Sequence, residues 1–346
     1  MVNIGIIGYG YWGPNLVRNF FAAKDCNVKL VADSRPERLA QLRKVFPAIE
    51  GVGNAEEIIY SPDIDAVVIA TPVSTHFRLA KMALLEGKHV LIEKPMTSSV
   101  RDAEMLINLA IQKRVLLMVD HTFLYTGGVE KMKQLVLSEE LGRIKYLDST
   151  RINLGLFQSD INVLWDLAPH DLSILSYISE ERPYSVNATG ITHTYNNIEN
   201  IAYLTVNYES GFIAHFNCSW TSPVKVRMML IGGDKKMILF NDLEPTEKIK
   251  IYDSGYSYSN DEERKQVMVD YRTGDIHVPK LKTTEALLGM ANDFVTCIEG
   301  NKQPRSNSLL GLDVVRILEA SDKSIKNQGR EVVLDSYEVP LSINTL

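Results

Sequence analysis

The chain has 346 residues and a formal net charge of −6; it is longer than one hydrophobic core usually organises, so two domains are predicted. Hydrophobic residues make up 45% of it and charged residues 23%, which is typical of a globular protein. Lysine and arginine are scattered rather than clustered, which argues against nucleic acid or an anionic membrane as a partner.

The three cysteines lie far apart and include no CxxC pair, so reduced thiols and a cytoplasmic location are expected. The apolar N-terminal run is short and broken by glycines, and no later run reaches about 18 apolar residues. Neither a signal peptide nor a membrane span is therefore expected.

The first part of the chain alternates β-branched apolar runs such as VKLVAD and AVVIATP with helical periods such as RPERLAQLRKVF and HFRLAKMALLEG. This alternation is typical of βαβ units, in which helices cover both faces of a parallel sheet. An α/β domain with a doubly wound sheet is predicted over residues 1–122.

After residue 122 the pattern changes to β-rich stretches, with candidate hairpin turns at ESG (209–211) and GGD (232–234). This pattern predicts an α+β domain over residues 123–346 with a large, mainly antiparallel open sheet. The polar stretch 256–275 is expected to be a loop or an exposed edge. Helices are expected at about 167–179, 283–299 and 307–327.

The stretch GYGYWG follows an apolar strand and opens a helix, which is the context that a GxGxxG dinucleotide-binding turn requires. In that motif Gly8 permits the tight turn, Gly10 lets the backbone approach a pyrophosphate, and Gly13 lets the helix pack on the strand. Tyr11 and Trp12 lie within the motif and are candidate cofactor contacts. The alternative is a plain strand-to-helix turn.

An acid about 20 positions after the motif is expected to bind the cofactor ribose, and Asp33 at the end of VKLVAD occupies that place. A carboxylate there accepts from both ribose hydroxyls of NAD and repels the 2′-phosphate of NADP, so NAD is the predicted cofactor. Ser34 and Arg35, which follow Asp33, are also candidate cofactor contacts, and Arg35 weakens the preference for NAD because an arginine pairs with phosphate. The alternative for Asp33 is a solvated strand end.

Polar residues follow two further apolar strands: Thr71 and Pro72 after AVVIA, and Glu93, Lys94 and Pro95 after HVLI. Both groups lie at the carboxyl ends of predicted parallel strands, where open α/β sheets bind their ligands. Lys94 is able to donate to a substrate hydroxyl or to oppose the charge on an alkoxide, with Glu93 orienting it. From the residues alone, a polar strand end is the commoner explanation.

The stretch WDLAPHD places Asp166 and His170 four residues apart, on one face of a predicted helix. Pro169 is tolerated only in a first helical turn, so both are expected at the helix entrance, where the macrodipole disfavours imidazolium. A neutral His170 would accept a proton from an alcohol, as a general base does in carbinol oxidation. The alternative is an N-capping acid followed by a structural histidine.

Three more residues are candidates for binding a sugar: His121 after the strand VLLMVD, and Arg151 and Asn153 on a later strand edge. A core position or an exposed strand face explains them nearly as well. The seven histidines show no ligand spacing, so no metal site is predicted.

In their order along the chain, GYGYWG, the ATP and EKP strand ends and the acid-xxx-histidine pattern resemble the glucose–fructose oxidoreductase and inositol dehydrogenase family, often called Gfo/Idh/MocA. The resemblance covers nearly the whole chain. It implies an N-terminal NAD-binding Rossmann domain, a C-terminal substrate domain, and a nicotinamide lying across the cleft between them. It also implies a homodimer or homotetramer formed through the open sheet.

The resemblance implies that Lys94, Asp166 and His170 are the catalytic residues. In the family the histidine exchanges a proton with the carbinol while hydride passes to or from nicotinamide C4. Cofactor contacts are implied for Thr71, Pro72, His76 and Glu93.

Two positions depart from the family pattern. Ala168 and Pro169 stand where glycine is common, and Ser173 stands where a second aspartate is frequent, which bears on one sugar-hydroxyl contact.

The segments HTFLY and NVLWDLAPHDLSIL look most similar to family members that act on nucleotide sugars, the UDP-N-acetylglucosamine and UDP-N-acetylglucosaminuronate 3-dehydrogenases of cell-surface polysaccharide pathways. The expected activity is therefore NAD-dependent oxidation of a sugar ring hydroxyl at C3 of a UDP-amino sugar. A deoxysugar 3-ketoreductase, an inositol or free-sugar dehydrogenase, and an NAD-binding sensor without catalysis are the alternatives.

Overall fold

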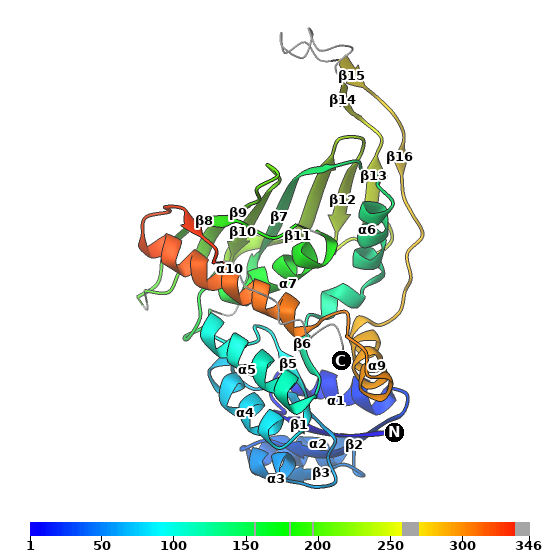
Figure 1. The fold of residues 1–346 in the computed structure, drawn as a ribbon, viewed down its shortest axis with the longest axis vertical. Helices are drawn as coiled ribbons and strands as arrows, with labels where there is room; N and C mark the ends of the chain where they lie inside the picture. Colours follow the sequence, from blue (N-terminus) through cyan, green and yellow to red (C-terminus); the bar gives the residue numbers. More distant parts are fainter. Residues whose placement is uncertain (156, 180, 196, 258–269, 336–346) are drawn as a thin grey trace. The chain divides into compact units, whose positions relative to one another are not determined.

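The structure is a computed structural model that describes residues 1–155, 157–179, 181–195, 197–257 and 270–335 (Figure 1). The chain divides into two compact units. The first unit contains residues 1–126 and 284–319, and the second contains residues 127–283 and 320–334.

The first unit is built on a parallel sheet with the strand order β3-β2-β1-β4-β5-β6. The predicted doubly wound sheet is therefore confirmed, and its order reverses between β1 and β4, the place where such sheets bind ligands. Strand β4 is buried at every position, because an unbroken apolar run suits a strand covered on both faces. The strands are β1 (Val2–Ile7), β2 (Cys26–Ala32), β3 (Glu50–Val52), β4 (Ala66–Ile69), β5 (His89–Glu93) and β6 (Leu117–Asp120).

Local signals in the sequence define the helices of the first unit. Asn54 and Glu57 form a capping box at the start of α3, and the Ser99 hydroxyl caps α5 by accepting the Asp102 amide. The helices are α1 (Gly13–Ala22), α2 (Pro36–Val45), α3 (Ala55–Ile59), α4 (Val73–Leu85), α5 (Val100–Lys113), the 3₁₀ helix η1 (Thr122–Tyr125) and α9 (Ala286–Gly300).

Residues 284–319 belong to the first unit, although the sequence predicted a single second domain over 123–346. Helix α9 packs on α1, where the rings of Phe20 and Phe294 meet edge to face with centroids 6.1 Å apart. Helix α10 (Ser308–Lys326) continues from residues of the first unit into residues of the second. Amphipathic periodicity predicts such helices but does not identify the sheet on which each packs, so the assignment could not be made from the sequence.

The second unit is built on a sheet with the strand order β16-β13-β12-β11-β7-β10-β9-β8-β17. Only β7 and β10 pair in parallel among these described strands, so the prediction of a mainly antiparallel sheet is confirmed. The strands are β7 (Ile144–Leu154), β8 (Ser185–Ile191), β9 (Ile201–Asn207), β10 (Ile213–Ser219), β11 (Thr221–Gly233), β12 (Met237–Asn241), β13 (Ile249–Tyr252), β16 (Ile276–His277) and β17 (Val332–Val333).

The turns between the strands of this sheet agree with the hairpin turns predicted at 209–211 and 232–234. Gly211 has φ +85° between β9 and β10, a backbone that glycine adopts without steric cost, and β11 ends at Gly233 just before the turn into β12. Within the predicted loop or edge, 256–275, strand β14 (Gly255–Ser257) pairs with β15 (Asp270–Arg272), and residues 258–269 lie outside the described part.

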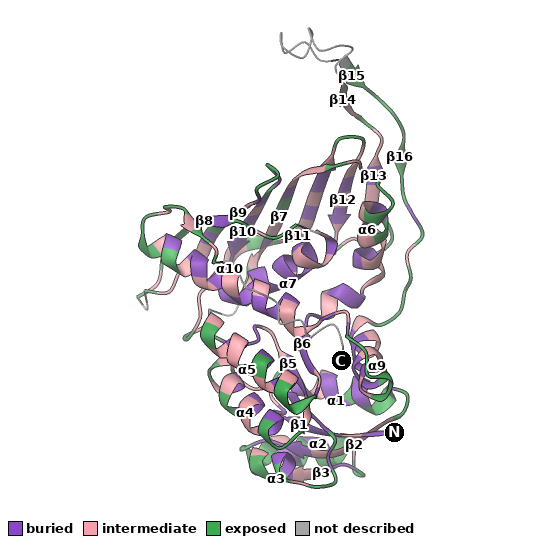
Figure 2. Ribbon diagram, viewed as in Figure 1, coloured by how far each residue is buried: buried purple, intermediate pink, exposed green. Residues whose placement is uncertain are grey.

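Two helices of the second unit differ from prediction. Helix α6 (Gly127–Leu137) was not expected, because it opens with two glycines that read as a loop. Helix α7 (Val163–Ile178) begins earlier than the predicted 167, at the side-chain cap of Asn162. It packs on β7, β9 and β10, and exposed and buried residues alternate along these strands (Figure 2).

Candidate functional site

The glycine-rich turn after β1 has the geometry of a phosphate-binding loop. Gly8 has φ +102°, and a Cβ there would lie 2.5 Å from the carbonyl oxygen of Ala70. A Cβ on Gly13 would lie 2.2 Å from the carbonyl oxygen of Gly8. At Gly10 the nearest atom to a Cβ is a guanidinium nitrogen of Arg35, at 3.4 Å, so no backbone crowds this glycine. The three glycines thus fit the roles predicted for them.

Asp33, at the end of β2, is a buried acceptor that already holds several donors. Its carboxylate accepts the Tyr9 amide at 2.8 Å and the Arg35 Nε and terminal guanidinium nitrogen at 3.0 Å each. Burial acts to raise the pKa of Asp33, but hydrogen bonds from Arg35 and Tyr9 outweigh it and lower that pKa. Ser34 is exposed between the two charged residues. A ribose binding to Asp33 would therefore share or replace the donors of Arg35.

Tyr11 and Trp12 take different positions in the same turn. Trp12 is the N-cap residue of α1, and its indole stacks at 18° on the ring of Tyr11, whose side chain is 87% exposed. No acid lies in the first turn of α1, so no side chain of that turn competes with a bound anion for its free amides. The turn therefore fits the pyrophosphate of a dinucleotide.

Replacing Asp33 with alanine should relax the preference for NAD over NADP by about 10- to 100-fold, because a hydrogen-bonded carboxylate contributes about 1.5–3 kcal/mol. Fluorescence titration with both cofactors gives the ratio of dissociation constants. Arg35→Ala is the control, since it retains the carboxylate and should preserve or sharpen the preference for NAD. An unchanged ratio in the Asp33 variant would show that another group selects the cofactor.

The ends of β4 and β5 are tied together by His76, which is 1% exposed. Its Nε2 lies 2.8 Å from the carbonyl oxygen of Thr71, and its Nδ1 lies 3.0 Å from that of Pro95. Burial lowers the pKa of His76, against the effect of these carbonyls. The ring is thus used in holding two strand ends in place. Pro72, by contrast, is exposed at the start of α4, and the Lys94–Pro95 peptide is cis.

Glu93 and Asp120 end the neighbouring strands β5 and β6 and are register partners. The Thr122 hydroxyl donates to Asp120 Oδ1, and the Lys94 amide donates to Glu93 Oε2 at 3.2 Å. Glu93 Oε1 and Asp120 Oδ2 are shielded from solvent, and no N–H or O–H of the described residues reaches them. Asp120 was not predicted as a site residue. Its position at the end of a parallel strand, beside the strand that ends in EKP, was the feature that pointed to it.

His121 follows Asp120 and is 1% exposed, and neither ring nitrogen has a hydrogen-bond partner within the described part of the chain. Burial, with a smaller contribution from the Lys94 charge, lowers the pKa of His121 to about 3. The imidazole is therefore neutral at physiological pH. Since buried polar groups are rarely left without partners, this ring fits a polar ligand better than it fits a core position.

The acid and the histidine of WDLAPHD lie on α7, in the second unit. Pro169 is inside this helix rather than in its first turn, which corrects the prediction of a helix entrance. The macrodipole acts mainly over the terminal turn, so the helix start does not by itself keep His170 neutral. The Trp220 indole donates to Asp166 Oδ2 at 3.0 Å, which fixes the carboxylate one turn before His170. Both Asp166 and His170 are half-buried.

Ser173, which stands where the family often has a second aspartate, lies one turn after His170. It is fully buried, and its hydroxyl donates to the carbonyl oxygen of His170 at 2.7 Å. This bond occupies the hydroxyl within the helix.

Arg151 is held in a buried ion pair. Its Nε and a terminal nitrogen donate to Asp171 at 2.9 and 2.5 Å, the Ser149 hydroxyl donates to the same carboxylate at 2.9 Å, and Arg151 is 3% exposed. This bidentate pair joins β7 to α7, so the position expected to line a sugar pocket serves to hold α7 on the sheet. Asn153, further along β7, is half-buried.

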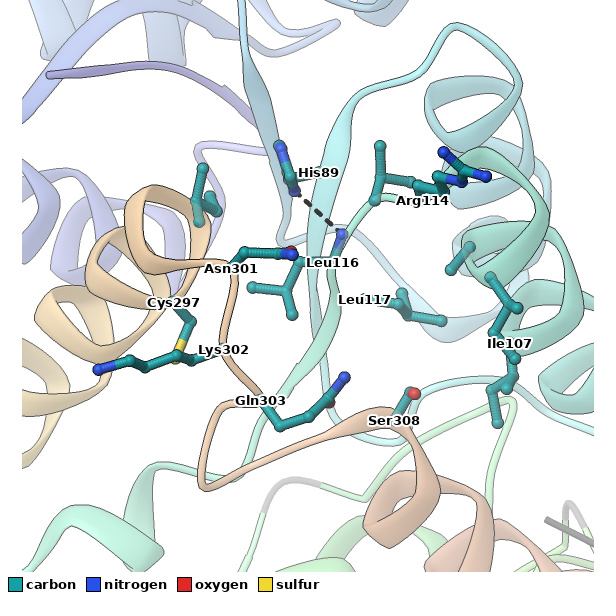
Figure 3. Close-up of a pocket in the computed structure, with 14 residues that line it drawn as sticks. His89, Ile107, Arg114, Leu116, Leu117, Cys297, Asn301, Lys302, Gln303 and Ser308 are labelled. Carbon is teal, nitrogen blue, oxygen red and sulfur yellow. Dashed lines mark hydrogen bonds between the residues drawn. The ribbon is translucent and has the colours of Figure 1, made fainter. Parts of the chain in front are cut away.

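A pocket in the first unit lies away from these residues. It is at the amino ends of β5 and β6, where His89 Nδ1 accepts the Leu116 amide at 3.0 Å, and Arg114 and Gln303 line it (Figure 3). Glu93 is at the other end of β5, so this pocket lies apart from the carboxyl ends of the strands, where the candidate site residues of this sheet are.

No group of three or more His, Cys, Asp or Glu residues suited to a metal ion occurs among the described residues. Within the same residues, no helix has both the length and the apolar character needed to cross a membrane.

Comparison with known families identifies both parts of the chain. Residues 2–121 match an oxidoreductase family with an NAD-binding Rossmann fold, and residues 129–239 match the GFO/IDH/MocA C-terminal domain. Together the matches cover more than half of the chain.

Individual relatives include two sugar or polyol dehydrogenases. The chain is 29% identical to UDP-N-acetylglucosamine 3-dehydrogenase of Acidithiobacillus ferrooxidans over 237 residues, which are 66% of this chain and 70% of that protein. It is 25% identical to myo-inositol 2-dehydrogenase of Thermotoga maritima over 194 residues, 55% of this chain and 58% of that protein. A solved structure of the Acidithiobacillus enzyme shares the fold, with a TM-score of 0.80, 23% identity and coverage of 95% of this chain and 99% of that one.

Proposed function

This chain belongs to the Gfo/Idh/MocA family of NAD-binding oxidoreductases, and on that premise we propose that it oxidises a sugar ring hydroxyl to a ketone at C3 of UDP-N-acetylglucosamine or its uronate. The family places it among NAD(P)-dependent enzymes that act on CH–OH groups. The proposed setting is cytoplasmic synthesis of precursors for surface polysaccharides.

The observation that carries the proposal is the buried imidazole of His121, which lies near Lys94 at the carboxyl end of the parallel sheet and has no hydrogen-bond partner among the described residues. A neutral imidazole and an ammonium group suit a ligand rich in hydroxyls. The imidazole both donates and accepts hydrogen bonds, and the ammonium group donates them. The similarity to a UDP-N-acetylglucosamine 3-dehydrogenase supports the choice of sugar.

Each remaining residue has a definite part in this proposal. NAD, held by the glycine-rich turn and Asp33, supplies the hydride acceptor. Lys94 donates to the reacting oxygen and opposes the negative charge that develops on it. His170 accepts the hydroxyl proton as general base, and Asp166, oriented by Trp220, binds a neighbouring hydroxyl or steadies the imidazole.

A panel of UDP-sugars, free sugars and inositols, assayed for NADH formation by absorbance, tests the substrate. We expect UDP-N-acetylglucosamine or its uronate to give the highest kcat/KM, and mass spectrometry of the product to show loss of two hydrogens. Turnover of free inositol without any nucleotide sugar would contradict the proposal and favour the inositol dehydrogenase alternative, which the relative from Thermotoga maritima supports. Turnover only of keto-sugars with NADH would favour a deoxysugar 3-ketoreductase.

We also propose that the chain forms a homodimer or homotetramer through the sheet face opposite α7. Apolar side chains are exposed on that sheet, including Leu154 at 68%, Tyr203 at 46% and Ile213 at 44%. Exposed apolar groups on one face are typical of an interface between proteins. Multi-angle light scattering on the intact chain measures the mass of the assembly directly.

A further inference from the structure

Two carboxyl groups face each other at the ends of β5 and β6. Glu93 and Asp120 are register partners in a parallel pair, so their side chains leave the same face of the sheet. Asp120 is 2% exposed, and although Glu93 is half-buried as a residue, its Oε1 is shielded from solvent. Among the described residues no N–H or O–H donor reaches Glu93 Oε1 or Asp120 Oδ2, so each carboxyl retains one unsatisfied oxygen.

A single shared proton satisfies both oxygens. Two neighbouring carboxyl groups in a medium of low dielectric constant do not both ionise, because their negative charges repel each other. When one of them is protonated, it donates a hydrogen bond to the other. Burial first, and then the Asp120 charge, raises the pKa of Glu93 well above its usual range. Burial also raises the pKa of Asp120, but hydrogen bonds from Thr122, Glu93 and Trp12 oppose that rise. The two carboxyl groups therefore hold one proton between them.

The other charged or titratable groups that face the pair do not remove the need for this proton. Lys94 follows Glu93 on β5, and its charge favours ionisation of Glu93 only as a smaller effect. His121 follows Asp120 on β6 and is neutral, so it adds no positive charge. Trp12 of the glycine-rich turn and Thr122 of η1 contribute donors without charge.

The place of the pair in the sheet connects it to the redox end of the cofactor. A doubly wound sheet binds a dinucleotide as two halves, one on each side of the point where the strand order reverses. That point lies between β1 and β4, and Asp33, the ribose acceptor of the adenosine half, is on β2. Strands β4, β5 and β6 therefore serve the nicotinamide half, whose ring is positively charged in NAD⁺ and uncharged in NADH.

We propose that Glu93 and Asp120 share one proton in the free enzyme and release it to solvent when NAD⁺ binds, but not when NADH binds. The pair thus makes the affinity for the oxidised cofactor depend on pH. Because the positive ring favours the ionised pair, NAD⁺ binds more tightly as the pH rises, up to about tenfold per pH unit between the bound and free pKa values of the pair. This proposal rests on the cofactor and not on the proposed sugar.

Isothermal titration calorimetry of the full chain with NAD⁺ or NADH, without sugar, tests the proposal. Repeating each titration in buffers of different ionisation enthalpy at one pH gives the number of protons released. We expect release approaching about one proton for NAD⁺ and none for NADH. Equal release with both cofactors, or none with NAD⁺, would overturn the proposal. Inactivity towards every sugar would leave this result unaffected, so the two proposals fail separately.

Glu93→Gln identifies the source of the proton, since the amide imitates a carboxylic acid that never ionises. Release should disappear in this variant, and the affinity for NAD⁺ should lose its dependence on pH. The matched control is Asp293→Asn, a carboxyl of the same unit held by the Tyr125 hydroxyl at 2.7 Å and the Arg305 amide at 2.9 Å, which should retain release. Release that persists in Glu93→Gln would place the proton elsewhere. If that variant does not fold, the difference in proton release between NAD⁺ and NADH on the unaltered chain is sufficient to test the proposal.

Discussion

Replacing His170 with alanine should lower turnover by about 10²- to 10⁴-fold, the usual contribution of one general acid or base. The affinity for NAD should change little, because the glycine-rich turn and Asp33 belong to the first unit and His170 to the second. Steady-state kinetics with the best substrate of the sugar panel measures the loss, and fluorescence titration measures cofactor binding.

The pH profile distinguishes a chemical role of His170 from a structural one. Loss of the base should remove the acidic limb of kcat/KM, whereas damage to folding should lower the whole profile. His193→Ala is a suitable control, since this histidine also lies in the second unit and its Nδ1 is bonded to the Asn200 side chain at 3.1 Å. Turnover that is unchanged in the His170 variant would refute its assignment as general base and favour the non-catalytic sensor.

Replacing Arg151 with alanine should lower the free energy of unfolding by about 3–5 kcal/mol, because it leaves the Asp171 charge buried without its partner. The side chains of the pair are only 4% and 6% exposed, so solvent screens them little. Urea denaturation followed by circular dichroism measures the change. The paired replacement Arg151→Met with Asp171→Leu should cost less than the sum of the single changes, since it removes both charges together.

The same variants test the role predicted for Arg151 from the sequence. If Arg151 bound the sugar, the paired replacement would raise KM strongly while stability recovered. If it serves to hold α7 on the sheet, KM should recover with stability. Kinetics of the single and double variants at a temperature where all are folded decide between these outcomes.

Much of the first unit was predictable because its signals are local. The glycine turn, the strand ends and the capping residues depend on backbone conformation within a few positions, and the parallel sheet follows from the alternation of strand and helix periods. The start of α7 was missed for a related reason. Asn162 is a good cap, but the weight given to Pro169 moved the expected start of the helix past it.

The pairing of side chains was not predictable in the same way. Asp166 meets Trp220 from 54 positions away, and Arg151 meets Asp171 from 20 positions away. Which residues meet depends on strand register and on the packing of a helix on a sheet, and neither is encoded in a short stretch. For this reason Arg151 resembled a substrate residue in the sequence but is an ion-pair partner in the structure.

The sequence by itself determined the class of protein and the type of cofactor, because both depend on local motifs whose backbone geometry few residues can satisfy. Only the tertiary structure decided that α9 belongs with the first unit, that Arg151 is paired with Asp171, and that Glu93 faces Asp120. These are consequences of long-range packing, because strand register and burial bring together polar residues that are distant in the sequence and make them interact strongly.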